Sequence, residues 1–273
     1  MKGASGSRCR QRSRRSRERV LAGGGDAAAC RPAPAGAVPS GYDGFNLNNA
    51  IVGGRVCNDP NPSSMPEYTF DPDLYANVAY FGQPPLIGAP SAAAVTTANA
   101  ALAAANTLGG LDRTYVIWQD LTAFQATGTT PPALRLDTGT LRIASDTVIY
   151  TNVPVDFGNT SSIEAAQACS IQDPPPTGTP ACPTFQVISA YPGSPCTGGV
   201  GNCPSIFGGN KIQFRPELAV LLYSREGTIE LKNDCNSDAC NDINHGAFYA
   251  NTVDAKNNLN LNYTPRIANA LGF

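Results

Sequence analysis

The sequence is poor in the residues that most often carry catalysis and in the apolar runs that anchor a chain in a membrane. It contains a single histidine, His245, and no stretch of about 20 apolar residues. A Ser-His-acid triad would have to use His245, which precedes Gly246 in a turn-like stretch, and no G-x-S-x-G elbow occurs. Glycine-rich nucleotide-binding loops are also missing. These absences argue against nucleophilic and nucleotide chemistry.

Charged residues are scarce too, and the two signs are separated along the chain. They make up 15% of the sequence. Residues 1–32 carry nine Lys or Arg and two acidic residues, which leaves ten basic and nineteen acidic side chains, a formal charge of −9, in residues 33–273. An acidic body lacks the clustered cations that neutralise phosphates, so we expect no nucleic-acid partner. It is compatible with an exposed extracytoplasmic protein.

Residues 1–40 consist almost entirely of Arg, Ser, Gly, Ala and Pro, without apolar periodicity. No core can form from this composition, so we predict a disordered, basic, low-complexity segment. A signal peptide needs an apolar run of about 7 to 15 residues, and none follows Val20 and Leu21. The alternative is a mis-assigned N-terminus, in which case an anchor helix would be missing from this chain.

Nine cysteines are present, and six of them form close pairs in the sequence. The pairs are Cys169 with Cys182, Cys196 with Cys203, and Cys235 with Cys240. Each pair lies in a loop rich in Pro, Gly, Asn or Asp, where a bridge can pin a segment that has little core, and no C-x-x-C zinc knuckle occurs. We therefore predict loop disulfides and an oxidising compartment. The partner of Cys57 and the full connectivity stay open.

The rest of the chain divides into two parts. With 23 Pro and 27 Gly, the composition favours short strands and turns over long helices. Residues 41–114 are predicted to be irregular with short strands and to end in one Ala-rich helix at about residues 91–108, which stops at Gly109 and Gly110. Residues 115–273 are predicted to form the main domain, interrupted by a Pro/Cys-rich insertion at residues 169–209.

A period of two recurs through this main domain and predicts short strands. The apolar steps are Leu134/Leu136, Leu141/Ile143, Val148/Tyr150, Val153/Val155, Ile212/Phe214, Ala219 to Tyr223, Ile229/Leu231, Phe248, Val253 and Leu259/Leu261/Tyr263. The first four are too closely spaced for ordinary hairpins, so we predict an all-β fold, a parallel right-handed β-solenoid or β-helix. A β-sandwich is the alternative. In the final step, Asn258, Asn260 and Asn262 are expected to line the polar side of a terminal strand and discourage further stacking.

One polar segment has the spacing of a calcium loop. Hard oxygen ligands at alternate positions suit calcium, and they are Asp234, Asn236, Asp238 and Asp242. Ala239 stands where such a loop needs Gly, however, and His245 stands where it needs a bidentate Glu. A polar loop closed by a disulfide explains the same residues, so calcium is the one cofactor to consider and none is otherwise expected.

A polysaccharide-cleaving enzyme on this scaffold would need paired carboxyl groups. The candidates are Asp137, Asp146 and Asp156 along the first strands, and Glu217, Glu226 and Glu230 along the later ones. Most fall at turns or on polar strand faces, where solvation accounts for them. We therefore assign no catalytic residue. Trp118 alternates with core-like neighbours and is predicted to be buried.

The segments PELAVLLYSREGTIELKN and GAFYANTVDAKNNLNLNY resemble the C-terminal region of bacterial type IV pilus assembly proteins of the PilX-like type. The shared pattern is two hydrophobic strands, then a Gly-x-hydrophobic-Tyr-Ala step and an Asn-containing strand that ends on Tyr. The matching positions are Gly246, Phe248, Tyr249, Ala250, Val253, Asn258, Leu261 and Tyr263. The resemblance covers roughly residues 130–273. It implies a β-helical, surface-exposed domain behind an N-terminal membrane helix, a helix for which this chain has no apolar stretch.

From these observations we expect a non-enzymatic, extracytoplasmic structural or surface domain of a bacterial pilus-assembly or adhesion-related protein, located at the cell surface or secreted. Its expected partners are other pilus or cell-surface proteins and surface glycans, with membrane contact only through a segment absent from this chain. The alternatives are a carbohydrate-active β-helix enzyme, either hydrolase or lyase, and a calcium-dependent binding module.

Overall fold

The computed structural model describes residues 68, 70–136, 139–158, 162–172, 174–194, 203–208, 212, 214–215, 217–231 and 246–254 with their side chains, and residues 20–23, 31–32, 51–53, 55–59, 232, 244–245, 255–256 and 260–262 as strand backbone alone. The helices are α1 (Ala94–Leu108), α2 (Thr122–Thr127) and a short 3-10 helix (Pro72–Leu74). The strands are β1 (Val20–Gly23), β2 (Arg31–Pro32), β3 (Ile51–Gly53), β4 (Arg55–Asp59), β5 (Val78–Phe81), β6 (Thr114–Ile117), β7 (Leu134–Arg135), β8 (Thr140–Ile143), β9 (Thr147–Thr151), β10 (Val155–Asp156), β11 (Ser162–Ala165), β12 (Thr184–Ser189), β13 (Ile206–Gly208), β14 (Ala219–Lys232), β15 (Asn244–Lys256) and β16 (Asn260–Asn262).

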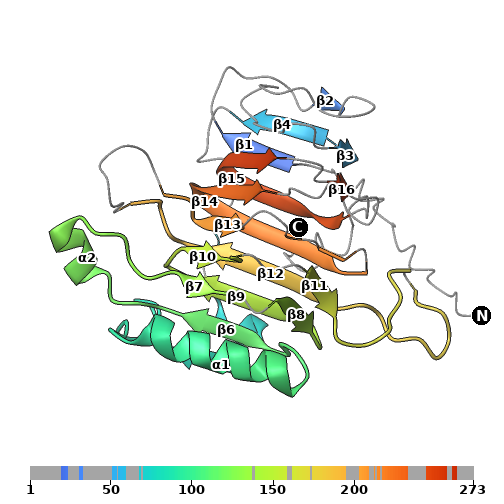
Figure 1. Ribbon diagram of the computed structural model, residues 1–273, viewed down its shortest axis with the longest axis horizontal. Helices are drawn as coiled ribbons and strands as arrows, with labels where there is room; N and C mark the ends of the chain where they lie inside the picture. Colours follow the sequence, from blue (N-terminus) through green and yellow to red (C-terminus); the bar gives the residue numbers. More distant parts are fainter. Residues whose placement is uncertain are drawn as a thin grey trace, which may run out of the picture.

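Most strands belong to one strongly curled sheet (Figure 1) whose main path runs β2-β4-β1-β15-β14-β12-β9-β6-β5. Of the described strand pairings, only β2 with β4 is antiparallel. From β6 to β12 consecutive strands do not pair: β9 pairs with β6 and β12, β10 with β7 and β13, and β11 with β8. The predicted all-β, parallel character is confirmed. The β-sandwich alternative is wrong, because such sandwiches are built from antiparallel sheets.

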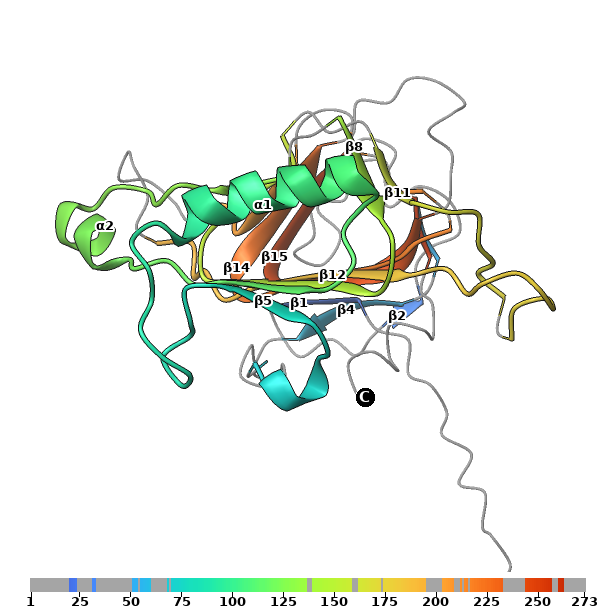
Figure 2. The same cartoon turned by 90° about the horizontal axis from the view of Figure 1, so that it is seen from below.

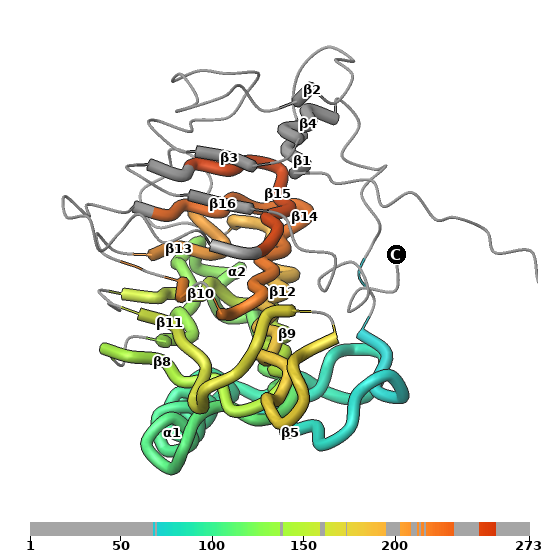
Figure 3. Tube along the Cα trace, turned by 90° about the vertical axis from the view of Figure 1, so that its right-hand side faces the viewer, coloured from blue at the N-terminus to red at the C-terminus, as the bar shows by residue number. Residues whose placement is uncertain are grey.

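The curl of the sheet brings three sets of strands around one interior. Figure 3 shows β8, β10 and β11 on one side, across from β9 and β12. The long strand β14 joins two of these sets, because its first half pairs with β12 and its second half with β13. Where it passes from one set to the other, its register with β15 shifts between Ser224 and Thr228.

The interior is filled by apolar side chains from every set. Buried residues of the main core include Ile149, Phe185, Val220 and Phe248 from the main path, and Phe157 from the turn that follows β10. Phe157 packs edge to face with Phe185 and with Phe214, with ring centroids 6.4 and 6.1 Å apart. Burial of such rings, at about 25 cal/mol per Å² of apolar area, is the main driving force for closing the sheet around them.

Helix α1 covers one end of this curled sheet (Figure 2). The sequence favours a helix here because Ala has the highest helix propensity, and Gly109 ends it in a conformation with φ of 139°. The helix buries Ala94, Val95, Ala98 and Leu102 against the core. It lies within the range in which the sequence predicts a helix.

Two asparagines of α1 bind the free backbone edge of β7 and β8. The amide of Asn99 accepts from Arg135 N at 2.8 Å and donates to Ala133 O at 3.5 Å. One heptad later, Asn106 accepts from Arg142 N at 2.7 Å and donates to Thr140 O at 2.9 Å. Each side-chain amide thus supplies the one hydrogen-bond donor and the one acceptor that the backbone of a neighbouring strand would otherwise provide. The helix thereby closes an edge that would otherwise be open to further pairing.

The backbone of Leu111 continues this closure beyond the helix. Leu111 N donates to Arg142 O at 2.8 Å, and Ala144 N donates to Leu111 O at 2.7 Å. Together with the Asn106 amide, these bonds satisfy four successive edge groups of β8 and of Ala144, the residue that follows it. The end of the sheet is therefore sealed by polar groups as well as covered by apolar ones.

Several regions differ from the sequence-based expectations. The range 169–209, expected to be an insertion, contains β12, which lies in the middle of the sheet between β9 and β14. The final strand β16 is not an edge, because it pairs with β15 on one side and with β3 on the other, which contradicts the capping role of Asn260 and Asn262. Within residues 41–114, where short strands are expected, β3, β4 and β5 join the sheet, whereas the range 1–40, where no strand is expected, supplies β1 and β2. The prediction of disorder for the remainder of residues 1–40 concerns positions outside the described residues.

We predict that Asn106→Leu lowers the free energy of unfolding by about 1–3 kcal/mol, because it removes two hydrogen bonds from the buried Asn106 amide to the partly buried backbone groups Thr140 O and Arg142 N, each worth about 0.5–1.5 kcal/mol. Urea unfolding followed by circular dichroism measures this change. Thr107→Leu, on the exposed side of the same helix, is the matched control and should stay within about 0.5 kcal/mol of the parent. Equal effects of the two substitutions would contradict the edge-closing role of Asn106.

Candidate functional site: an aromatic cleft on the outer face of the sheet

The strands of the main path are buried on both faces. Along β9, Ile149 points into the main core, whereas Val148 and Tyr150 belong to a second buried cluster on the outer face. The sequence pattern had identified Val148 and Tyr150 as the core-facing pair, and it missed that all five residues of β9 are buried. The second cluster is covered by Tyr68 and Phe70 from the segment before β5.

Aromatic rings dominate this outer cluster. Tyr150 stacks on Trp118 and on Phe70, with centroid distances of 5.2 and 5.1 Å and interplanar angles of 24° and 16°. Tyr68 is tilted against Tyr150 at 5.8 Å and against Tyr223 at 6.3 Å. Because Tyr150 and Tyr223 each align with Ile188 from opposite sides, the Tyr68 ring lies between two rings that stand two strand spacings apart.

A cleft of about 270 Å³ opens beside these rings. It is lined by Tyr68, Trp118, Tyr150, Ile188, Ser189, Ala190, Tyr223, Arg225 and Glu226. The shape follows from the side chains of three neighbouring strands: β12 and the residue after it present the shorter Ile188 and Ala190, whereas β9 and β14 present tyrosines. We call this feature the aromatic cleft. The prediction that Trp118 is buried is wrong in part, because this residue is partly exposed and lines the cleft.

Polar groups stand among the rings of the aromatic cleft. Arg225 and Glu226 come from β14 near its register shift, and Glu226 is exposed. Ser189 is 3% exposed, and its Oγ accepts a hydrogen bond from Tyr191 N at 3.3 Å. The hydroxyl of Tyr68 is buried without a hydrogen-bond partner among the described residues. Leaving such a group unpaired costs free energy, so a partner for it would be stabilising.

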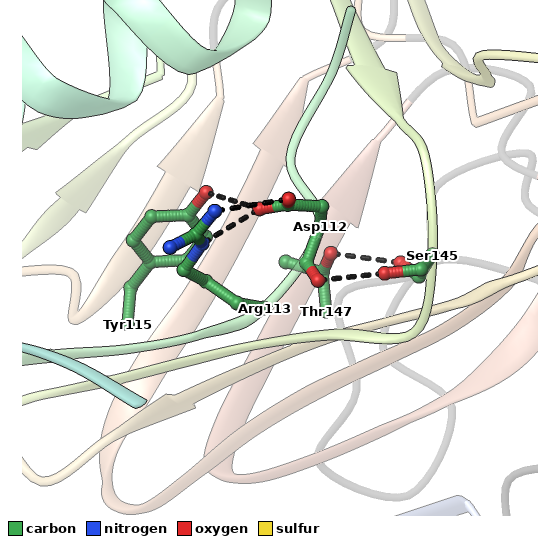
Figure 4. Close-up of polar contacts among 5 residues, drawn as sticks. All are labelled: Asp112, Arg113, Tyr115, Ser145 and Thr147. Carbon is green, nitrogen blue, oxygen red and sulfur yellow. Dashed lines mark hydrogen bonds and ion pairs between the residues drawn. The ribbon is translucent and has the colours of Figure 1, made fainter. Parts of the chain in front are cut away.

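A second polar cluster lies where the chain enters β6 (Figure 4). Arg113 donates from Nε and Nη2 to the two carboxylate oxygens of Asp112 at 2.7 and 3.0 Å. These hydrogen bonds hold the pKa of the Asp112 carboxyl below its ordinary value, while burial raises the pKa of the Tyr115 phenol. The Ser145 hydroxyl donates to Asp112 O at 2.7 Å. The cluster therefore fastens the start of β6 to the turn before β9.

The acidic residues considered from the sequence fall into different places. Asp146 accepts from Thr184 N at 2.7 Å and from Thr184 Oγ1 at 3.0 Å, which ties the turn before β9 to the start of β12. Asp156 accepts from Gly158 N at 2.6 Å in the turn after β10. Glu226 lines the aromatic cleft. Glu230 of β14 is aligned with Asp254 of β15, and Asp137 lies outside the described residues.

Some predicted site residues can be placed and others cannot. The Cys169–Cys182 disulfide is present and pins the loop between β11 and β12, which confirms that pairing. Cys203 is also disulfide-bonded, whereas Cys196, Cys235 and Cys240 lie outside the described residues. So do the calcium candidates Asp234, Asn236, Asp238 and Asp242. Within the described part of the chain, no group of three or more His, Cys, Asp or Glu side chains is placed to hold a metal ion.

The positions matched to the pilus pattern lie mostly on one strand. Gly246, Phe248, Tyr249, Ala250 and Val253 belong to β15, and Leu261 belongs to β16. Asn258 and Tyr263 fall outside the described residues. A Cβ at Gly246 would overlap the carbonyl oxygen of Val220, so glycine at this position permits the close approach of β15 to β14.

Comparisons of the chain with protein-family models, with curated proteins and with solved structures gave no match. They therefore do not link it to type IV pilus proteins or to any other family. Among the described residues, no helix has both the length and the apolar character needed to cross a membrane.

We predict that Asp146→Ala destabilises the fold by about 1–2 kcal/mol, because it removes the acceptor for the buried Thr184 N–H. Asp146→Asn keeps an oxygen at the same position and should restore most of the loss. Urea unfolding compares the two variants with Glu217→Ala, a carboxylate in the turn before β14. If Asn proved as damaging as Ala, the negative charge, and not the hydrogen bonds to Thr184, would be the important property of Asp146.

We predict that Arg113→Gln raises the pKa of the Asp112 carboxyl towards its ordinary value, because it removes the guanidinium hydrogen bonds. Since this pKa is lowered in the folded state, the ion pair adds stability above the unfolded-state pKa and loses it as the pH falls through the folded-state pKa. The gain is below about 1 kcal/mol, because both side chains are half exposed. Carboxyl carbon NMR titration measures the shift, with Arg135→Gln as the control. An unchanged Asp112 titration in Arg113→Gln would contradict the assignment.

Proposed function

We propose that the chain is a non-enzymatic, extracytoplasmic surface domain, built as a right-handed parallel β-solenoid, of a bacterial pilus-assembly or adhesion-related protein. The observation that carries the proposal is the parallel curled sheet together with its disulfide-pinned loop. Parallel strands arranged in three sets around one core are what a solenoid requires. The Cys169–Cys182 bridge supports an oxidising compartment, because such bonds are rare in reducing cytosol.

The structural role is supported by how the polar side chains are used. Asp146 and Asp156 are candidates for the paired carboxyl groups of an enzyme. Both instead accept hydrogen bonds from backbone N–H groups at turns. The long loop between β11 and β12 projects from the sheet (Figure 1). A rigid stack that displays loops is suited to contacts with other pilus or cell-surface proteins, and these are the partners that we propose.

A carbohydrate-active enzyme is the second candidate, and one observation favours it. Glu230 and Asp254 are aligned on neighbouring parallel strands, about 4.8 Å apart in the backbone, and retaining glycosidases hold their two carboxyl groups about 5–5.5 Å apart. Release of reducing sugars from a polysaccharide, abolished by Glu230→Gln without loss of stability, would replace the structural proposal with this one.

We expect the chain to be accessible on intact cells of its native bacterium. An antibody against the purified domain should label cells without permeabilisation, and mechanical shearing should release the chain together with pili. Peptide mass spectrometry after thiol trapping should recover Cys169 linked to Cys182. Labelling only after permeabilisation would contradict the surface location. If intact cells were labelled but the sheared fraction did not contain the protein, the surface location would stand and the association with pili would be contradicted.

A further inference from the structure

We propose that the aromatic cleft binds one pyranose ring of a neutral glycan. The proposal deepens the surface-domain function, on which it rests for the biological source of the glycan, by naming the ligand class and the residues that would hold it. Trp118, Tyr68 and Tyr223 would contact the ring, while Arg225 and Glu226 would bind its hydroxyl groups.

The first argument is the fit of a six-membered ring. Tyr68 already stands between Tyr150 and Tyr223, at centroid distances of 5.8 and 6.3 Å, which shows that the spacing of these strands accommodates a ring. The adjoining cleft of about 270 Å³ is lined by the shorter side chains of Ile188 and Ala190 as well as by the rings. A sugar ring presents C–H groups with partial positive charge, which are attracted to the electron-rich faces of aromatic rings.

The second argument is the unpaired hydroxyl of Tyr68. This group is buried without a partner among the described residues, and the ring that carries it lines the cleft. A hydroxyl group can both donate and accept, so a rotation of the Tyr68 side chain that brings its hydroxyl to the cleft would let a sugar hydroxyl satisfy it. Most ligand sites combine apolar walls with a few polar groups of this kind.

The third argument is charge. The described lining contains one guanidinium, Arg225, and one carboxylate, Glu226, whose formal charges cancel. Hydrogen bonds from neutral hydroxyls to such ionised groups are stronger than neutral ones. A uronate would gain from Arg225 but would be repelled by Glu226, so the pair favours a neutral sugar.

A proline-rich peptide is the competing ligand, because aromatic grooves also bind polyproline segments. The observations favour the sugar for two reasons. The carboxylate of Glu226 needs a hydrogen-bond donor, and a polyproline segment has none, whereas a sugar hydroxyl can donate to Glu226 and accept from Arg225. Its volume also suits one sugar ring better than the extended polyproline helix, which needs a longer groove.

The test is isothermal titration of the full chain with β-1,4-linked glucose and N-acetylglucosamine hexasaccharides, with oligogalacturonate and with decaproline. We expect at least one neutral sugar to bind with a Kd of about 1 mM or below, and oligogalacturonate to bind more weakly. Trp118→Leu and Glu226→Gln should each weaken binding by about tenfold, as expected when a contact to the ligand is lost. Tyr80→Leu changes an aromatic residue of β5 that is 37% exposed and outside the cleft lining, so it should leave binding unchanged.

The outcomes separate this proposal from the surface function. No binding of either neutral sugar at about 10 mM by protein with an unchanged melting temperature overturns the sugar site and leaves the surface location untouched. Decaproline binding in place of the sugars overturns it in favour of a peptide. Equal weakening by Tyr80→Leu and Trp118→Leu also overturns it. If Trp118→Leu lowers the melting temperature, Glu226→Gln becomes the decisive variant, because Glu226 is exposed and its substitution should not affect folding.

Discussion

The structure depends on satisfying the backbone at the end of a parallel sheet. Each strand added to such a stack presents one row of N–H and C=O groups to the next, so the row at the end must find other partners. Asn99 and Asn106 of α1 supply these partners to β7 and β8 from side-chain amides. A helix can therefore end the sheet without leaving buried polar groups unpaired. Leucine in place of either Asn would preserve the packing and lose this property.

The same principle extends to the join between α1, β6 and β9. The backbone of Gln119 exchanges two hydrogen bonds with the Asn152 amide, at 2.9 and 3.0 Å. The side chain of Gln119 donates to Ala92 O at 2.6 Å and accepts from Val95 N at 3.2 Å at the start of the helix. Both residues are buried. Their amides fix the position of α1 relative to two strands in a way that apolar contacts, which are not directional, cannot.

The sequence predicted the fold correctly where apolar and polar residues alternate clearly along a strand. Leu134, Leu141, Ile143 and Val155 lie in short strands as expected, and the parallel arrangement followed from their close spacing. The strand TFQVIS was missed because its flanks are rich in Pro and Cys, yet Phe185 and Val187 are fully buried. The faces of β9 were misassigned because a strand buried on both sides has no polar alternation to read. The register of the strands aligns Ile188 with Tyr150 and Tyr223, which are distant in the sequence. No local sequence pattern predicts this alignment, because it depends on how the whole chain folds.

The aromatic cleft shows why sites on such a sheet are hard to predict but simple to alter. In parallel, in-register pairing, equivalent positions of successive strands form a column on the outer face, so a short side chain between two long ones leaves a gap one strand wide. Ile188 between Tyr150 and Tyr223 is such a position, and the Tyr68 ring occupies the space above it. The backbone and the inner core do not depend on the size of an outer residue, since Val187 and its neighbours fill the interior independently. Substitutions in one outer column can therefore reshape the outer surface while the inner core that supports it stays the same.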